Sequence, residues 1–233
     1  VINIPKFKTH DFMIFTGAVK NLYGCLYGRK KLEYHLKAGR SPEKFAEILL
    51  DILRVVKLSL NIMDGVIGMD GSGPSNGRVR GIGLIIASAD ALSLDTVACA
   101  IAGIDPVNVP LLAIANRLGL PSADIDEVET VGESVDAVRL TDFLMPPTGD
   151  MVSRIPNFIY SMARNQFVKK PVFNRKKCIG CHLCKNACPA KVIAGEGIKL
   201  DIDYNSCIRC YCCREVCPHG AIEIKPGTLG KII

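Results

Sequence analysis

Long apolar segments are missing from this chain of 233 residues. The longest apolar stretches, such as residues 81–88 and 109–115, are far shorter than the roughly 20 residues that a membrane-spanning helix needs. The chain starts at Val1 within a strand-like segment, without an initiator methionine, a basic leader or a signal-like apolar region. We therefore expect no membrane span, a cytoplasmic location, and a natural N-terminus that lies upstream of Val1.

Cysteine is scarce in the first 177 residues, which hold only Cys25 and Cys99. The other nine of the eleven cysteines lie between Cys178 and Cys217. A disulfide framework is typical of small secreted chains, whereas short repeated spacings beside a large cysteine-poor region favour metal binding. A glycine fingerprint of the form G-x-G-x-x-G after a strand is also absent, so the sequence does not indicate a hydride cofactor.

The clustered cysteines form the motif C-x-x-C-x-x-C-x-x-x-C-P, which occurs twice. The first copy comprises Cys178, Cys181, Cys184 and Cys188, and the second comprises Cys207, Cys210, Cys213 and Cys217. The copies are offset by 29 residues, and their neighbours repeat as well, since Ile179 corresponds to Ile208. The sequence therefore contains an internal duplication.

This spacing is typical of 4Fe-4S clusters. Three thiolates two residues apart wrap one face of a cubane, and in two-cluster ferredoxins the fourth cysteine ligates the other cluster. We therefore predict two 4Fe-4S clusters, one held by Cys178, Cys181, Cys184 and Cys217 and the other held by Cys207, Cys210, Cys213 and Cys188. Residues 171–226 resemble bacterial-type two-cluster ferredoxins, which implies electron transfer.

Two alternatives concern the same cysteines. Zinc also binds Cys-x-x-Cys pairs, but two zinc sites would not explain three evenly spaced cysteines followed by Cys-Pro, twice. Cys212 is a thiol beyond the repeat, and the repeat register selects its neighbour Cys213 as the ligand. We predict that Cys212 is a bystander.

The formal net charge is +6. A 4Fe-4S core with its four thiolates carries about −2 when oxidised, so two clusters would lower this charge to about +2. The mild basicity is thus mainly counter-charge for the clusters, and it does not indicate nucleic-acid binding. We expect a redox partner protein or electron carrier, and no nucleic acid.

The cysteine-poor part alternates strand-like and helix-like patterns. We expect strands at residues 1–8, 58–63, 83–87 and 127–131, helices at 41–56, 90–102 and 109–118, and a glycine-rich loop at 65–83. This alternation predicts an α/β domain at residues 1–145, with a mainly parallel sheet and flanking helices. A linker at 146–171 and a small α+β ferredoxin-like domain at 172–233 follow. The linker carries an apolar stripe that suits docking of the two domains, with a membrane-surface helix as the alternative.

Polar side chains follow the predicted strands at their carboxyl ends, where ligands bind in open α/β sheets. The candidates for a shared pocket are Lys8, His10, Lys20, Asn21 and Asp64. A cation-rich set facing a glycine-rich loop suits a small anionic or carbonyl substrate. Each residue also has a structural interpretation as a cap, a turn residue or a solvated side chain, and both interpretations stay open.

Several short motifs carry a family resemblance. They are IPKFKTH at residues 4–10, KNLYG at 20–24, MDG at 63–65 and DALSLD at 90–95, followed by GIDP at 103–106. Residues 1–145 resemble the domain-of-unknown-function 362 family, whose members often carry a C-terminal ferredoxin module. The resemblance implies that more of the domain precedes Val1, and it implies no particular reaction.

Two functions follow as hypotheses. In the first, the chain is an iron–sulfur oxidoreductase, or the electron-transfer subunit of one, whose clusters exchange electrons with an α/β domain of unknown substrate. In the second, the α/β domain is a ligand- or partner-binding or maturation module, and the clusters are structural or sensory.

Overall fold

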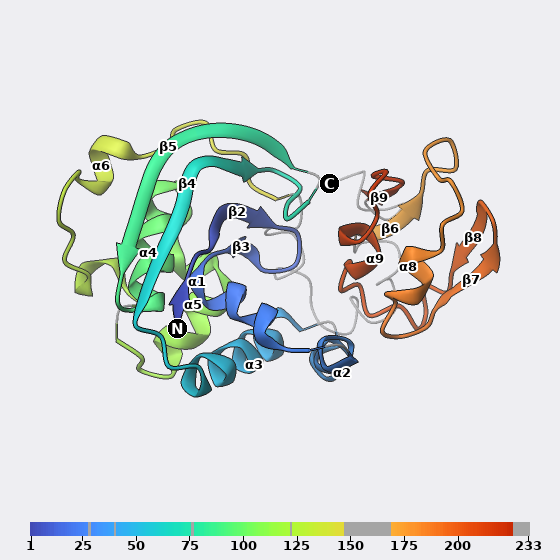
Figure 1. Ribbon diagram of the computed structural model, residues 1–233, viewed down its shortest axis with the longest axis horizontal. Coiled ribbons are helices and arrows are strands. Elements are labelled where there is room, and N and C mark those ends of the chain that lie inside the picture. Colours follow the sequence, from blue (N-terminus) through green and yellow to red (C-terminus); the bar gives the residue numbers. More distant parts are fainter. Residues whose placement is uncertain (28, 40, 76, 122, 147–168, 226–233) are drawn as a thin grey trace, which may run out of the picture. The chain divides into compact units, whose positions relative to one another are not determined.

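The computed structural model describes residues 1–27, 29–39, 41–75, 77–121, 123–146 and 169–225. The chain forms two compact units (Figure 1). The first comprises residues 1–34 and 41–147 and is called the α/β unit here, and the second comprises residues 35–40 and 148–233 and is called the cysteine unit. Most of the predicted linker, including its apolar stripe, lies outside the described residues.

A mixed sheet organises the α/β unit. Its strands are β1 (Ile2–Asn3), β2 (Lys6–His10), β3 (Ile14–Thr16), β4 (Leu60–Asp70) and β5 (Arg78–Ser88). The central strand β4 pairs in parallel with β1 and β2, which follow each other along one of its edges, and antiparallel with β5. Strand β3 pairs antiparallel with β2. The α/β class predicted from the sequence is confirmed.

The glycine-rich segment between β4 and β5 differs from its prediction. Instead of one long loop, the two strands pair along most of their length, and the described residues 71–75 and 77 lie between them. A Cβ atom at Gly65 would lie 2.9 Å from the Leu84 carbonyl oxygen, and one at Gly68 would lie 2.7 Å from that of Phe7. These glycines therefore permit close backbone approach where the strand register shifts, a role that the sequence pattern does not distinguish from a turn.

The helices of the α/β unit are α1 (Ala18–Asn21), η1 (Leu22–Cys25), α2 (Arg29–Ala38), α3 (Pro42–Val55), α4 (Ala91–Ile101), η2 (Pro106–Asn108), α5 (Pro110–Arg117), η3 (Ile125–Glu127) and α6 (Val135–Val138). Helix α2 begins in this unit, and its residues from His35 on belong to the cysteine unit. Some of the helices start at a side-chain cap. The Ser41 hydroxyl accepts the Lys44 N–H at 3.1 Å, and the Asp90 carboxylate accepts the Ser93 N–H at 2.7 Å, which starts α3 and α4. The three helices predicted here are confirmed.

The strand predicted at residues 127–131 is wrong. The Asp124 carboxylate accepts the Asp126 N–H at 3.1 Å and starts the short 3-10 helix η3, and the chain continues without a strand partner in the described residues. A local side-chain hydrogen bond thus competes with strand formation.

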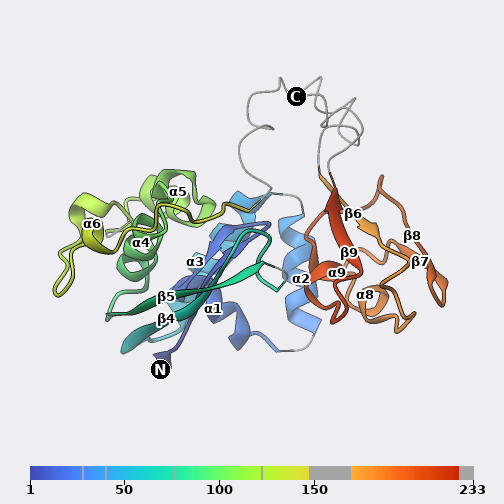
Figure 2. The same ribbon diagram turned by 90° about the horizontal axis from the view of Figure 1, so that it is seen from above.

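The described helices α4, α5 and α6 lie together on one side of β4 and β5 (Figure 2). Asn61 and Met63 point to the covered face and are fully buried. Ile85 points to the opposite face and is 68% exposed. Residues alternate between the faces because successive strand side chains point in opposite directions.

The cysteine unit is built twice from the same elements. They are β6 (Lys170–Phe173), α8 (Leu183–Asn186), β7 (Ile193–Glu196), β8 (Lys199–Ile202), α9 (Cys212–Glu215) and β9 (Ile222–Lys225). The start of β8 follows that of β6 by 29 residues, and the same offset relates α9 to α8 and β9 to β7. Strand β6 pairs antiparallel with β9, and β7 pairs antiparallel with β8. Each pair therefore joins one strand from each half.

The duplication extends to individual backbone angles. Equivalent residues share a left-handed conformation in three places: Gly180 and Arg209 with φ of 74° and 56°, His182 and Tyr211 with 61° and 59°, and Lys191 and Gly220 with 53° and 55°. This conformation costs a residue with a Cβ atom about 1–2 kcal/mol. The backbone path is thus kept in both halves even where a side chain makes it unfavourable.

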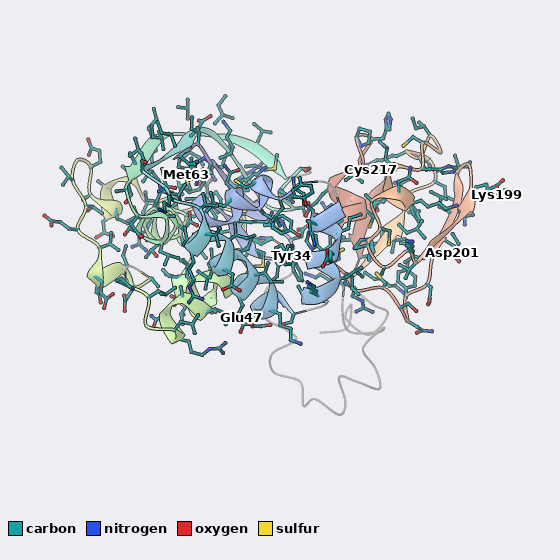
Figure 3. The ribbon with its side chains drawn as sticks, turned by 60° about the horizontal axis from the view of Figure 1, so that its bottom comes forward. Tyr34, Glu47, Met63, Lys199, Asp201 and Cys217 are labelled. Atoms are coloured by element: carbon teal, nitrogen blue, oxygen red, sulfur yellow. The ribbon has the colours of Figure 1, made fainter. Side chains whose placement is uncertain are left out.

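Aliphatic side chains and thiols share the core of the cysteine unit. Along β8, Leu200 and Ile202 are buried, while Lys199 and Asp201 point outward (Figure 3). The core also contains Ile193, Ile222, Cys184, Cys207 and Cys213. Among the described residues, no helix combines the length and apolar character that a bilayer crossing requires.

Candidate metal centre

Two hollows in the cysteine unit collect the thiols of the motifs. The first is lined by Cys178, Cys181 and Cys184 of the first half and by Cys217 of the second half. The second is lined by Cys207, Cys210 and Cys213 of the second half and by Cys188 of the first half. Each hollow thus combines three thiols of one motif with the fourth thiol of the other.

Equivalent backbone contacts position the thiols in both halves. The Cys178 N–H donates to the Asn174 carbonyl at 3.2 Å, and the Cys207 N–H donates to the Asp203 carbonyl at 3.0 Å. Cys184 lies in α8 and Cys213 in α9, each directly after a left-handed turn. The local path of the chain therefore turns the first three thiols of each motif toward one hollow.

Two buried thiols, Cys184 and Cys207, favour their protonated form in the absence of metal. Burial raises the pKa of Cys184, and the neighbouring Cys217 and Cys178 raise it further. Burial likewise raises the pKa of Cys207, with Cys210 and Cys188 adding to the effect. Because iron binds thiolates, metal binding here would release protons and remove the repulsion between neighbouring sulfurs.

The two hollows differ in burial and charge. In the first, Cys181 is exposed, whereas in the second Cys207, Cys210 and Cys213 are all buried. Arg209 lines the second hollow and is only 4% exposed, while its equivalent in the first half is Gly180. The second hollow is therefore drier and has a buried positive charge beside it.

The lining of both hollows fits an iron–sulfur group. Four thiols per hollow supply soft ligands, and the remaining lining is mostly aliphatic, with Leu200 and Ile222 in the first hollow and Ile193 and Ile202 in the second. An apolar shell excludes water from the cluster and influences its reduction potential. The assignment of individual cysteines to clusters stays a prediction.

The extra thiol, Cys212, lies outside the lining of the second hollow. Within the cysteine unit, a ring nitrogen of His35 and the sulfurs of Cys210 and Cys212 all lie within 4.8 Å of one another. A hydrogen bond from Cys212 lowers the pKa of Cys210, and the same contact together with burial raises the pKa of Cys212. Sequence reasoning missed His35, because no motif surrounds it.

The candidate residues of the α/β unit have structural partners. The Asp64 carboxylate accepts a hydrogen bond from Lys6 Nζ at 2.6 Å and forms an ion pair with it on the open face of the sheet. The ring of His10 is 2% exposed, and its Nδ1 accepts the N–H groups of Phe12 at 3.0 Å and Met13 at 3.3 Å. His10 therefore stabilises the turn between β2 and β3.

The remaining candidates lie on other elements. The Asn21 side chain donates to Asn3 Oδ1 at 2.8 Å, and Asn3 donates in turn to Asn61 Oδ1 at 2.9 Å, which ties α1 to the sheet. Lys8 pairs in register with Thr16 on β3, and Lys20 lies in α1. Their role in a shared substrate site stays a prediction.

A cavity of about 500 Å³ lies elsewhere in the α/β unit. It is bounded by β5, α4 and residues 127–138, with Leu84, Ile86, Ser88, Ser93, Leu94 and Val97 in its lining. None of the five candidate residues lines it. Sequence analysis did not predict this cavity, because residues 127–131 were expected to form a strand.

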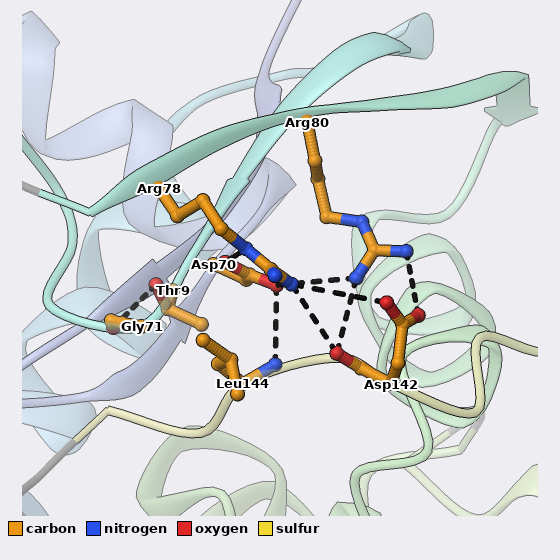
Figure 4. Close-up of polar contacts among 7 residues, drawn as sticks. All are labelled: Thr9, Asp70, Gly71, Arg78, Arg80, Asp142 and Leu144. Carbon is orange, nitrogen blue, oxygen red and sulfur yellow. Dashed lines mark hydrogen bonds and ion pairs between the residues drawn. The ribbon is translucent and has the colours of Figure 1, made fainter.

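A buried carboxylate that is not among the five candidate residues lies at the end of β4 (Figure 4). Asp70 accepts hydrogen bonds from Arg78 at 2.7 and 3.0 Å, from Arg80 at 3.2 Å and from the Leu144 N–H at 3.1 Å. Arg80 also pairs with Asp142 at 2.8 Å. Burial raises the pKa of Asp70, but the arginine and backbone hydrogen bonds outweigh it, so the pKa is lowered. The network fastens residues 142–144 to the hairpin.

Asp95 is a second buried carboxylate. It is 2% exposed and accepts the N–H groups of Ala18 and, at 3.0 Å, Val19 at the start of α1. A Cβ atom at Gly17 would collide with it, so glycine is required for this contact. Burial raises the pKa of Asp95 to about 7 although the backbone donors oppose this. The residue locks α1 against α4.

The α/β unit and the thiol-lined unit together define an iron–sulfur protein of two domains. Residues 1–100 match the model of the domain of unknown function DUF362, and residues 170–218 match that of the 4Fe-4S dicluster domain. The chain is therefore a DUF362 family protein with a C-terminal ferredoxin-type domain that binds 4Fe-4S iron–sulfur groups and has electron-transfer capacity.

One relative matches about three quarters of the chain. The chain is similar to the thylakoid-associated protein sll1697 of Synechocystis sp. (strain ATCC 27184 / PCC 6803 / Kazusa), with 34% identity over 179 residues. The match covers 74% of this chain and 54% of the relative, so the chain spans about half the length of that protein.

Proposed function

We propose that the cysteine unit binds two 4Fe-4S clusters and passes single electrons between an external carrier and the α/β unit. One cluster is ligated by Cys178, Cys181, Cys184 and Cys217, and the other by Cys207, Cys210, Cys213 and Cys188. The observation that carries this proposal is the pair of hollows, each lined by three thiols of one motif and the fourth of the other. A bound cluster supplies a reversible one-electron centre.

The two ligand sets adjoin, which supports transfer between them. Cys184 belongs to the first set and Cys213 to the second, and both lie in the same apolar core. Cys184 also contributes to the raised pKa of Cys213, after burial and the nearer thiols. The exposed Cys181 makes the first hollow the side on which an external redox protein exchanges electrons.

In this proposal the protein is an oxidoreductase or the electron-transfer subunit of one. Lys8, His10, Lys20, Asn21 and Asp64 remain the candidate substrate residues, and a small anionic or carbonyl compound remains the expected substrate class. The contacts of His10, Asn21 and Asp64 with their own unit give the competing structural role direct support.

A specific observation also favours a second function. The thiols of both motifs are part of the hydrophobic core of the cysteine unit, so a cluster there would hold the fold together. In that case the α/β unit is a ligand- or partner-binding or maturation module, and the clusters are structural or sensory. The cytoplasmic location stays a prediction under both functions.

Metal analysis and redox titration test the proposal. Anaerobically purified protein is expected to contain about eight iron and eight acid-labile sulfide per chain, with broad absorption near about 400 nm. Stoichiometric zinc without sulfide would contradict it. Reversible bleaching by dithionite and recovery with an oxidant support electron transfer, whereas clusters that resist reduction, or unfold the unit when reduced, favour the structural alternative.

A further inference from the structure

The second half of the cysteine unit carries a thiol that the first half lacks. With the offset of 29 residues, Cys212 occupies the place that Leu183 has in the first half. Both residues begin a short helix, and both follow a left-handed residue, His182 or Tyr211. The duplication therefore predicts an apolar side chain at position 212, and the thiol is a departure specific to one half.

The environment of Cys212 directs its sulfur toward a proposed ligand. Cys212 is 8% exposed, whereas Leu183 is 47% exposed. Its sulfur lies within 4.8 Å of the Cys210 sulfur, so the two buried thiols are close neighbours. Cys210 lines the second hollow, while Cys212 does not. The extra thiol thus lies beside a proposed cluster ligand without being one of the four thiols of the hollow.

We propose that Cys212 is a positioning residue whose thiol donates an S–H···S hydrogen bond to the Cys210 thiolate and raises the reduction potential of the second cluster. This inference rests on the ligand assignment proposed above. Reduction adds negative charge that is shared by the ligand sulfurs, so a donor to one of them stabilises the reduced state more than the oxidised state. Leu183 has no donor, and the first cluster lacks this effect.

The contact is buried, which increases its influence. Cys210 is 6% exposed and Cys212 is 8% exposed, so water does not compete freely for the sulfur. The neighbouring Arg209, 4% exposed, acts in the same direction on the same half. Removing the thiol alone leaves this charge in place, so the two contributions are separable by substitution.

The test is made in a parent with a single remaining cluster. In the full chain, Cys217→Ser is expected to remove the first cluster and leave the second. The Cys217→Ser parent is compared with its Cys212→Ser and Cys212→Ala variants. The three proteins are titrated anaerobically, and the titration is monitored by electron paramagnetic resonance. Cys99→Ala is the control, since it removes a fully buried thiol from α4 in the α/β unit.

We expect Cys212→Ala to keep the cluster and to lower its midpoint potential. Cys212→Ser retains an O–H donor and should keep most of the original potential, whereas a purely packing role would give both variants the same value. The control should leave the potential unchanged. Equal potentials in all three proteins overturn the inference, and so does loss of the cluster in Cys212→Ala, which would make Cys212 a ligand. A Cys217→Ser parent without any cluster overturns the proposed ligand assignment itself.

Discussion

The residues that act together are close in sequence in the cysteine unit and far apart in sequence in the α/β unit. In the cysteine unit, three thiols of each hollow lie within six residues of one another, for example Cys178 to Cys184. In the α/β unit, Asp95 binds the N–H of Val19, 76 residues away, and Asp70 binds that of Leu144, 74 residues away. Local spacing makes chemistry visible in a sequence, whereas long-range pairing hides it.

The difference also concerns what each set of residues does. The thiols face hollows and are available to a bound group, while Asp70, Asp95 and Asn61 are engaged by their own fold. Substitutions in the cysteine unit should therefore change metal content and colour. Substitutions in the α/β unit should change stability and leave the colour as it was.

The largest effect is expected for the fourth cysteine of each motif. Cys188→Ser should remove the cluster held by Cys207, Cys210 and Cys213, and Cys217→Ser should remove the other, because each completes the opposite hollow. Each variant should keep about half of the iron and sulfide. Electron paramagnetic resonance of the reduced variants should give two different spectra. Loss of the cluster from the same motif as the substituted cysteine would disprove the crossed arrangement.

A large effect on stability is expected at Asp70. Asp70→Asn weakens the hydrogen bonds from Arg78, Arg80 and Leu144 and leaves buried donors poorly paired. We expect the α/β unit to lose about 2–3 kcal/mol of unfolding free energy, measured by urea denaturation followed by circular dichroism. Asp142→Asn is the matched control, since its side chain is 69% exposed and a change there should be much smaller. The absorption of the clusters should be the same in both variants.

The raised pKa of Asp95 predicts that the stability of the α/β unit depends on pH. Its pKa is raised from 3.8 to about 7 in the folded state, so the folded state holds a proton that the unfolded state has released between these values. The stabilisation from this proton is complete below the unfolded-state pKa. It is lost as the pH rises toward the folded-state pKa, and the free energy of unfolding falls by about 1.4 kcal/mol for each pH unit.

Asp95→Asn checks this slope. Urea unfolding of the α/β unit between about pH 5 and pH 7 should show a fall in stability for the natural chain that is absent in the variant. The variant itself can be less stable at all pH values, because only the slope is compared. Parallel slopes in the two proteins would mean that Asp95 is ionised throughout this range.

The smallest effect is expected at the exposed Lys6–Asp64 pair. Its side chains are 45% and 44% exposed, and such pairs contribute little to folding. Asp64→Asn should leave both the unfolding midpoint and the cluster absorption unchanged. An electron-linked activity that is lost in Asp64→Asn without any change in folding would instead support the substrate pocket. Both units would then contain residues that act on a bound group.

Much of the local structure could be predicted from the sequence. Ser41-Pro42 and Asp90 mark the starts of α3 and α4, because capping and proline act within one helical turn. The duplicated motif indicated two similar halves, and β6 to β9 repeat in that manner. The candidate thiols were found for the same reason, since their spacing is itself the signal.

Tertiary structure decided what the distant residues do. Gly65 and Gly68 allow β4 to approach its neighbours, and the pattern of glycines alone predicted a loop instead. Asp95 reaches α1, and the Cys212 sulfur lies within 4.8 Å of the Cys210 sulfur, whereas Leu183 at the equivalent position of the first half has no thiol. In each case the partner is selected by packing and burial in the folded chain. Spacing along the chain determines only which side chains are close before folding begins.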